Sequence, residues 1–234
     1  MSLLQKISTG CRELDKFLEG GISFENVSLI YGEAETGKTT LAMQLAVNCA
    51  MQGYKTLFID CDGTFSARRL SQIASKNFKD VAEQIILMKP NTFREQITVI
   101  DKLPEYVAKN FGLVIVDTLT SLYRVEIAEH TNKAFELNRE LNRQMALLAQ
   151  IAKTRKIAVI ITSQVRSVFD EAYVSIEPVA TRVLKFWADI IIALCPTENS
   201  QVIRAVLEKS QKGTQPITFQ LKIEETGIHD YQTR

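Results

Sequence analysis

Short apolar runs rich in Val, Ile and Leu alternate along the chain with longer segments whose apolar residues recur every three or four positions. The runs predict strands buried on both faces of a sheet, and the longer segments predict helices. The expected strands are residues 27–31, 55–60, 84–88, 113–117 and 156–162, and the expected helices are residues 40–51, 66–77, 92–109 and 131–155. This alternation favours an α/β fold with a mostly parallel, twisted sheet flanked by helices.

Both ends of the chain depart from the alternation. Residues 1–22 form a leading segment, in which 7–18 predict a short helix closed by two glycines. Residues 163–181 are expected to be irregular. Three further apolar runs follow with no long helix between them, at residues 188–194, 202–208 and 217–223. They predict antiparallel C-terminal strands over 188–234, within a single domain over 1–234.

Residues 32–39 carry the motif G-x-x-x-x-G-K-[ST] of a phosphate-binding loop, between an expected strand and an expected helix. Backbone N–H groups of such a loop turn inward around phosphate oxygens. Lys38 would reach the β and γ phosphates, and the Thr39 hydroxyl would bind Mg²⁺. The expected nucleotide-binding residues are Gly32, Glu33, Ala34, Glu35, Thr36, Gly37, Lys38, Thr39 and Thr40.

Polar residues after the other expected strands complete this candidate site. Asp117 ends an apolar run and is expected to anchor the magnesium with Thr39; an ordinary strand-end carboxylate is the alternative. Asp60 and Asp62 follow a second run, and we expect Asp60 to be structural. Gln164 follows a third, where an amide could sense the γ phosphate or simply be buried and hydrogen-bonded.

The composition of the chain excludes few classes of function. The net charge of +1 favours neither nucleic acid nor a membrane surface as partner. Four scattered cysteines (Cys11, Cys49, Cys61 and Cys195) predict reduced thiols, and His130 and His229 lie too far apart in sequence to suggest a metal site. No signal peptide or bilayer-spanning run is recognisable, so we expect a cytoplasmic location.

Four sequence blocks resemble the RecA/RadA superfamily of recombinase ATPases, in the family's order. The first block, residues 7–22, begins with Ile-Ser-Thr-Gly, and the second, 58–70, contains Asp-Cys-Asp-Gly-Thr-Phe. The third, 116–124, begins with Val-Asp-Thr, and the fourth, 159–165, contains Thr-Ser-Gln. The resemblance implies a RecA-like core that binds ATP and Mg²⁺. It implies that Lys38, Asp62 and Gln164 take part in hydrolysis, with Asp62 where the family has a catalytic glutamate, and that Arg69 lies near the adenine.

The resemblance is best to an archaeal branch that is little more than the ATPase core. Filament-forming members add an N-terminal DNA-binding domain and a Phe-x-x-Ala polymerisation motif, and we expect neither here. This branch implies a role in DNA repair and homologous recombination, DNA binding, weak ATPase activity and no strand exchange of its own. The implied partners are a RadA-type recombinase or a DNA-junction nuclease.

Two departures from the family pattern bear on activity. Asp62 is shorter than glutamate by one methylene, about 1.5 Å. Because a misplacement of about 1 Å can cost roughly a hundredfold in rate, we expect tight ATP binding and slow turnover. The expected DNA loops, 126–131 and 166–182, have no excess of cations although Arg166 and Arg182 flank the second, so we expect weak, salt-sensitive DNA binding.

Two further groups have open roles. Lys209 and Lys212 follow an expected strand where family members reach a neighbouring subunit's γ phosphate, which would support an ATP-dependent homo-oligomer; a solvated turn is the alternative. Val183, Leu184, Phe186 and Trp187 form an apolar cluster, expected to be core rather than interface. The competing functions are a KaiC-like signalling ATPase and a non-hydrolysing ATP-dependent adaptor.

Overall fold

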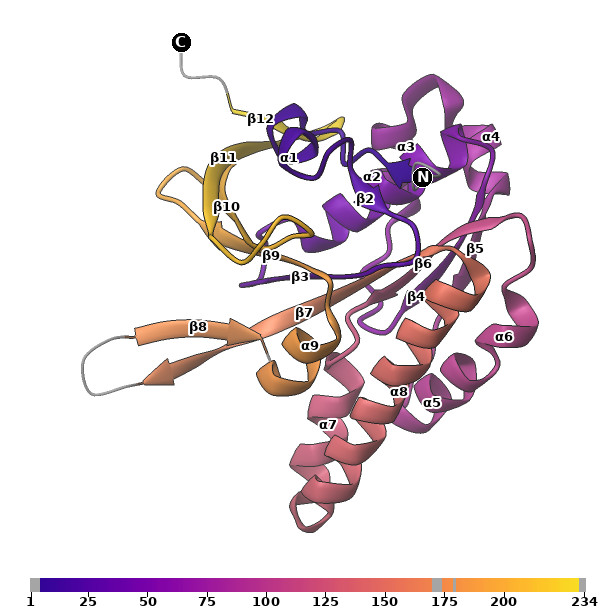
Figure 1. The fold of residues 1–234 in the computed structure, drawn as a ribbon, viewed down its shortest axis with the longest axis vertical. Helices are drawn as coiled ribbons and strands as arrows, with labels where there is room; N and C mark the ends of the chain where they lie inside the picture. Colours follow the sequence, from indigo (N-terminus) through magenta and orange to yellow (C-terminus); the bar gives the residue numbers. More distant parts are fainter. Residues whose placement is uncertain (1–4, 170–173, 179, 232–234) are drawn as a thin grey trace.

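The structure is a computed structural model that describes residues 5–169, 174–178 and 180–231, with only the backbone of 166–169 and 174–178. Its ten-stranded sheet has helices on both faces (Figure 1), and β1 (Lys6–Ile7) pairs separately with β2 (Ile22–Ser23). This confirms the expected α/β class.

Five neighbouring strands of the parallel part of the sheet lie in the order β3-β7-β6-β4-β5, and a sixth parallel strand borders β3 on its other side. The five are β3 (Val27–Gly32), β4 (Lys55–Asp60), β5 (Ile85–Met88), β6 (Phe111–Asp117) and β7 (Ala158–Phe169). Successive side chains point to opposite faces, so that Ile30 packs in one hydrophobic core and Leu29 in the other. Burial on both sides explains why these strands are continuous apolar runs.

The helices cover both faces of this sheet (Figure 1). They are α1 (Arg12–Phe17), α2 (Lys38–Met51), α3 (Ala67–Ala74), α4 (Phe78–Glu83), α5 (Phe93–Asp101), α6 (Leu103–Tyr106), α7 (Ser121–Glu129), α8 (Ala134–Arg155) and α9 (Thr181–Trp187). The single helix expected over 92–109 is wrong. It divides at Lys102, and Pro104 lies in the first turn of α6, where its missing N–H costs nothing.

The C-terminal strands differ in one respect from the expectation. β9 (Ile190–Pro196) pairs in parallel with β3, so the antiparallel extension begins only with β10 (Val202–Lys209). It continues through β11 (Ile217–Glu224) and β12 (Gly227–Asp230), a strand that the apolar pattern did not predict. α9, which precedes β9, supplies the crossover that a parallel neighbour needs.

The expected irregular stretch over 163–181 is also wrong. β7 pairs with β3 as far as Gln164 and from Val165 onward pairs in antiparallel with β8 (Val174–Pro178). This β7–β8 ribbon projects from the body of the molecule (Figure 1). Gln164 therefore lies where β7 leaves the central sheet, although it does not end the strand.

A buried glutamine on α2 joins the two ends of the chain. The Gln44 amide donates to the carbonyls of Thr9 and Ile228 at 2.7 and 2.9 Å, and its oxygen accepts from the Ile228 N–H at 2.7 Å. The leading segment and the β11–β12 hairpin are thereby fastened to the helix that follows the phosphate loop.

All four cysteines are free, as expected, and Cys11, Cys49 and Cys61 are buried. Burial raises the pKa of the Cys49 thiol to about 11 and that of Cys11 to about 12. Among the described residues, no helix combines the length and apolarity that crossing a bilayer requires.

Candidate nucleotide-binding site

The phosphate-binding loop connects β3 to α2, and two of its glycines are required by close contacts. A Cβ on Gly32 would lie 2.1 Å from the carbonyl oxygen of Leu194, on the neighbouring strand. Gly37 has a φ of +84°, and its Cβ would lie 3.0 and 3.1 Å from the side chains of Ile228 and Ile223. The loop is therefore held between β9 and the C-terminal hairpin, and its path requires glycine at both positions.

The loop is closed on itself by a lysine and a threonine. Lys38 Nζ donates to the Glu33 carbonyl at 2.5 Å, and the Thr36 hydroxyl donates to the same oxygen at 2.9 Å. Burial lowers the pKa of Lys38, while Asp117 and Asp62 oppose that shift. The ammonium group lies between the loop and two carboxylates, and phosphate oxygens would be stronger acceptors for it than the carbonyl is.

Asp117, at the end of β6, is a buried carboxylate with one unsatisfied oxygen. Oδ1 accepts a hydrogen bond from the Thr162 hydroxyl at 2.5 Å, whereas the buried Oδ2 has no hydrogen-bond partner among the described residues. Burial raises the pKa of Asp117; the hydroxyls of Thr162 and Thr39 lower it, and Asp62 and Asp60 raise it. A buried carboxylate with a free oxygen beside the phosphate loop fits Mg²⁺, which also takes phosphate and water ligands.

The described part of the chain contains no group of three His, Cys, Asp or Glu side chains suited to a metal. A cation at Asp117 would accordingly depend on the nucleotide for most of its ligands, as Mg²⁺ does in phosphate-transfer sites.

Asp62, just after the end of β4, meets Gln164, which lies where β7 leaves the central sheet. Asp62 Oδ2 accepts from the Thr118 hydroxyl at 2.5 Å and from Gln164 Nε2 at 3.4 Å. The Gln164 oxygen accepts from the guanidinium of Arg124, on α7. Sequence reasoning missed Thr118 and Arg124, although both stand in the block 116–124.

These side chains line one cleft of about 460 Å³, bounded by Glu33, Ala34, Glu35, Lys38, Thr39, Asp62, Thr64, Thr118, Gln164 and Val165. Seven of these ten positions were predicted from motifs far apart in sequence. Asp117 lies behind the lining, where its carboxylate is reached through Thr39 and Lys38.

A second cavity, of about 220 Å³, continues along the loop past Thr40 to Ile223 of β11. Arg69 does not line this cavity; it donates to the carbonyls of Glu224 and Glu225, next to Ile223, at 2.7 and 2.9 Å. The guanidinium thus supports the β11–β12 turn. Ile223 is far from the loop in sequence, so no local sequence pattern predicted that it would line the same cavity.

Asp60 has structural contacts. Its carboxylate accepts from the backbone N–H groups of Thr64 and Phe65 at 3.0 and 3.2 Å and lies 3.5 Å from the amine of Lys89. It holds the turn that carries Asp62 into the cleft.

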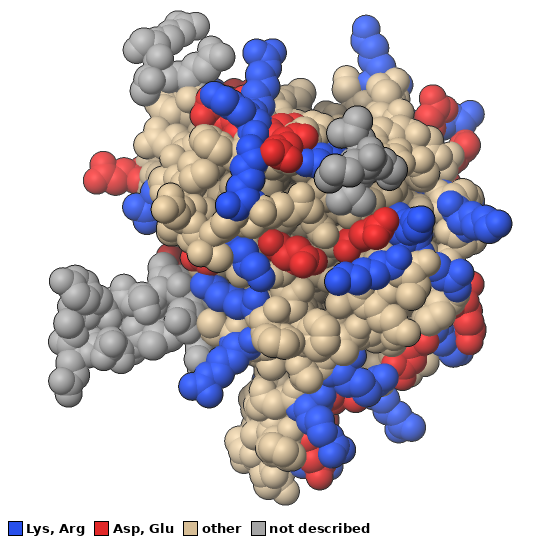
Figure 2. Space-filling model, in the orientation of Figure 1, with Lys and Arg blue, Asp and Glu red and all other residues tan. Residues whose placement is uncertain are grey.

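The expected DNA loops look different in the structure. Residues 126–129 are the last turn of α7, so the loop expected over 126–131 is mostly helical because the helical pattern runs on to Glu129. Arg182 is exposed on α9, and the Arg166 side chain lies outside the described residues. On the face seen in Figure 2, cationic and anionic side chains are interspersed.

The two candidate trans-acting lysines have contacts within the chain. Lys209 Nζ donates to the Ala188 carbonyl at 2.5 Å, and the Lys212 amine lies 3.0 Å from the exposed carboxylate of Glu19. Neither lysine lines the 460 Å³ cleft.

The apolar cluster on α9 is divided by the helix. Leu184 is buried, but Phe186 is 74% exposed, so the expectation that the whole cluster is core is wrong for Phe186. Successive helical positions point in different directions, which separates residues that the sequence places together.

A glycine-rich loop between strand and helix, a buried strand-end carboxylate and polar residues along one edge of a parallel sheet define a RecA-type core. A family model described as Rad51 matches residues 2–231, and the chain belongs to that family.

Its relatives include proteins described as "DNA repair and recombination protein RadB". The one from Methanococcoides burtonii is 33% identical, over 97% of this chain and 99% of its own length. The one from Methanocaldococcus jannaschii is 35% identical, over 92% and 98%. A solved structure described as the RadB recombinase superposes with a TM-score of 0.79 at 33% identity, covering 97% of this chain and all of that one. These matches confirm the predicted likeness to the archaeal branch, RadB.

The substitution Asp117→Asn tests whether the buried carboxylate is held for a cation. The folded-state pKa of Asp117 is raised, so ionising it costs stability as the pH rises through that pKa. Without nucleotide, Asp117→Asn should therefore unfold at higher urea than wild type at neutral pH, and the difference should disappear in acid. Mg-ATP should stabilise wild type and not the variant.

Asp60→Asn is the matched control, because its carboxylate already has N–H and lysine partners. It should lower stability under the same conditions. A nucleotide-free Asp117→Asn protein that is less stable than wild type at neutral pH would contradict this role for Asp117.

Proposed function

We propose that this chain is an ATP- and Mg²⁺-binding protein of the RadB type that acts in DNA repair and homologous recombination, in the cytoplasm. The observation that carries the proposal is the buried oxygen of Asp117, which has no hydrogen-bond partner in the described part of the chain. It lies behind a phosphate-binding loop whose lysine lines the neighbouring cleft. The family match favours this role over a KaiC-like signalling ATPase.

The residues divide the work of binding. Backbone N–H groups of 32–39 and the Lys38 ammonium would hold the phosphates, and Thr39 and Asp117 would hold Mg²⁺. Bound Mg²⁺ supplies charge neutralisation at the phosphates. The cavity between Thr40 and Ile223 is suited to the adenine, and Arg69 would support its wall through the β11–β12 turn.

Turnover is expected to be slow because the side chains that orient water are short and engaged. Asp62 accepts hydrogen bonds from Thr118 and Gln164, and Gln164 is also engaged by Arg124. A carboxylate with fewer free lone pairs and a shorter reach activates water poorly. The same contacts keep open a second function, an adaptor that binds ATP without hydrolysing it.

Asp62→Glu should raise the rate of ATP hydrolysis by about tenfold or more, because the longer side chain restores about 1.5 Å of reach. Asp62→Ala should abolish the residual rate and leave Mg-ATP affinity unchanged. The hydrogen bonds of Asp62 in the described structure go to Thr118 and Gln164, and not to Lys38 or Thr39. Phosphate release under saturating ATP measures both. A fast wild-type enzyme would reject the proposal of slow turnover, and no hydrolysis in any of the three would favour the adaptor.

DNA binding is proposed to be weak and electrostatic. Arg182 is exposed on α9, which packs beside β8. Arg182→Glu should lower affinity for single-stranded DNA by about tenfold at low salt, and moderate salt should lower wild-type affinity similarly. Fluorescence anisotropy measures both, with Lys153→Glu, at the exposed end of α8, as control. Tight binding that neither salt nor Arg182→Glu reduces would contradict the proposal.

We also propose an ATP-dependent homo-oligomer, association with a RadA-type recombinase or a DNA-junction nuclease, and no strand exchange by this chain alone. Lys209 and Lys212 are the candidate contacts to a neighbouring nucleotide. In the monomer, Lys209 donates to its own Ala188 carbonyl, so it would have to exchange that partner for phosphate.

Light scattering with and without ATP tests the oligomer. ATP should increase the mass of wild type, and Lys209→Ala should reduce the increase at an unchanged unfolding midpoint. Lys222→Ala, which removes an exposed lysine paired with Glu224, should behave as wild type. A monomer under all conditions would refute self-association, and repeating the measurement with a RadA-type recombinase separates self-association from partner binding.

A further inference from the structure

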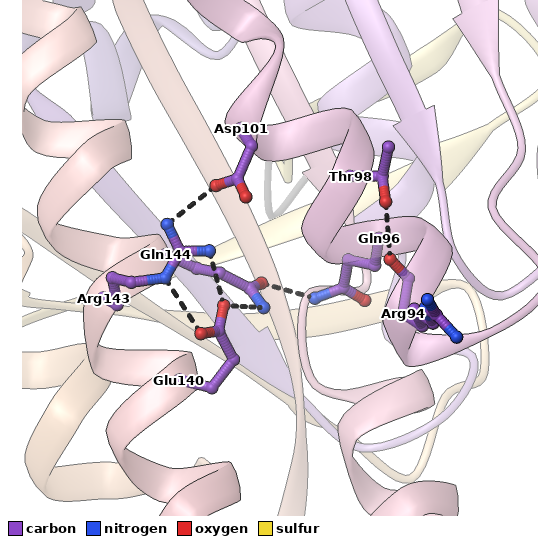
Figure 3. A network of polar contacts seen from close by, with 7 residues as sticks. All are labelled: Arg94, Gln96, Thr98, Asp101, Glu140, Arg143 and Gln144. Carbon is purple, nitrogen blue, oxygen red and sulfur yellow. Dashed lines mark hydrogen bonds and ion pairs between the residues drawn. The ribbon is translucent and has the colours of Figure 1, made fainter.

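Two glutamines are buried between α5 and α8, outside the nucleotide cleft. Gln96 and Gln144 are both 0% exposed, and Gln96 Nε2 donates to Gln144 Oε1 at 2.9 Å. Figure 3 shows them facing each other from the two helices. Their surroundings are the hydrophobic core that includes Phe93, Leu141 and Leu148. Burying polar side chains in such a core costs free energy, so these two glutamines call for a role other than core packing.

The same amide also holds the connection that follows Asp117. Gln96 Nε2 donates to the carbonyl of Leu119 at 3.1 Å. The Leu119 N–H donates in turn to the Thr162 carbonyl at 3.2 Å. The connection between β6 and α7 is therefore held on one side by Gln96 and on the other by β7.

This connection carries a side chain that reaches the cleft. Thr118 is the neighbour of Leu119, and its hydroxyl donates to Asp62 at 2.5 Å. A shift of the Leu119 carbonyl would move Thr118 and, with it, the hydrogen bond that orients the Asp62 carboxylate.

A polar network at the surface lies beside the buried glutamine pair. Gln144 Nε2 lies 3.4 Å from Glu140, and Arg143 donates both to Glu140 and to Asp101 of α5 at 2.7 to 2.9 Å (Figure 3). These contacts join α5 to α8 at the surface, whereas the Gln96 amide itself is held by Gln144 and the Leu119 carbonyl.

Stability alone does not account for the pair. Gln96 Oε1 is buried with no hydrogen-bond partner among the described residues. A partly satisfied buried polar pair is less stabilising than apolar side chains of the same volume. The contact of Gln96 with the Leu119 carbonyl explains the buried glutamines better than a gain in stability does.

We propose that Gln96 is a positioning residue for ATP turnover. Through the Leu119 carbonyl it fixes the connection 118–120, and thereby holds Thr118 against Asp62, while Gln144 orients the Gln96 amide. This role rests on the proposed function, because it requires Asp62 to act on the water that attacks ATP.

Two variants of Gln96 separate positioning from packing. Gln96→Leu keeps the volume approximately and removes the donor, and Gln96→Glu keeps the shape and turns the donor into an acceptor facing a carbonyl. Arg143→Gln is the matched control, because it loosens α5 from α8 without touching the connection. Urea denaturation should show that Gln96→Leu folds but is less stable than wild type, because the buried Gln144 Oε1 and the Leu119 carbonyl lose their donor.

The first measurement is amide hydrogen exchange of residues 118–121 without nucleotide. Both Gln96 variants should exchange faster there than wild type, and Arg143→Gln should not. The second is steady-state hydrolysis of Mg-ATP. In both Gln96 variants kcat should fall by about ten- to a hundredfold with KM unchanged, because the misplaced group acts only in the transition state.

The outcomes distinguish this proposal from the proposed function. If wild type hydrolyses ATP and Gln96→Leu matches it in kcat and in exchange, the positioning role alone is overturned. An equal loss of kcat in Arg143→Gln would overturn it as well, because general loosening of the helices would then explain the effect. If wild type hydrolyses no ATP, the ATPase proposal fails, and the role of Gln96 in turnover fails with it.

Discussion

The carboxylate of Asp117 is almost completely buried, and the neighbouring elements of the site are arranged around it. One of its oxygens accepts a threonine hydroxyl and the other has no partner among the described residues. Burial of an incompletely paired charge costs free energy, and the buried ammonium of Lys38 across the phosphate loop compensates it only in part. A cation bound by Asp117 and by nucleotide phosphates would neutralise the remaining buried negative charge. Nucleotide binding would then also stabilise the fold.

The fold delivers this arrangement through its strand order. Parallel strands end at one edge of the sheet, so β3, β4, β6 and β7 bring the phosphate loop, Asp62, Asp117 and Gln164 together. The second layer of contacts works against rapid chemistry, since Asp62 and Gln164 are engaged by Thr118 and Arg124. These contacts are the basis of the proposal that the site acts as a binding switch rather than as a fast hydrolase.

Local patterns predicted the parts of the fold that depend on local physics. β4 has the expected bounds, 55–60, because a short apolar run between turn residues has few alternatives, and α2 begins within the motif that predicted it. Prediction failed where partners far away in sequence decide. β7 continues past Thr162 because β8 pairs with it, and β9 is parallel because α9 lets the chain cross over.

The sequence by itself determined the class of site, since the spacing of glycines, Lys38 and Thr39 sets backbone geometry within a single loop. It also determined which strand ends would contribute carboxylates. Only the tertiary structure decided how those groups are engaged: that Arg69 supports the β11–β12 turn, that Arg124 engages Gln164, and that Gln96 reaches the carbonyl of Leu119. Hydrogen bonds between distant segments depend on distances and directions that exist only after the sheet and its helices have packed, and no periodicity along the chain encodes them.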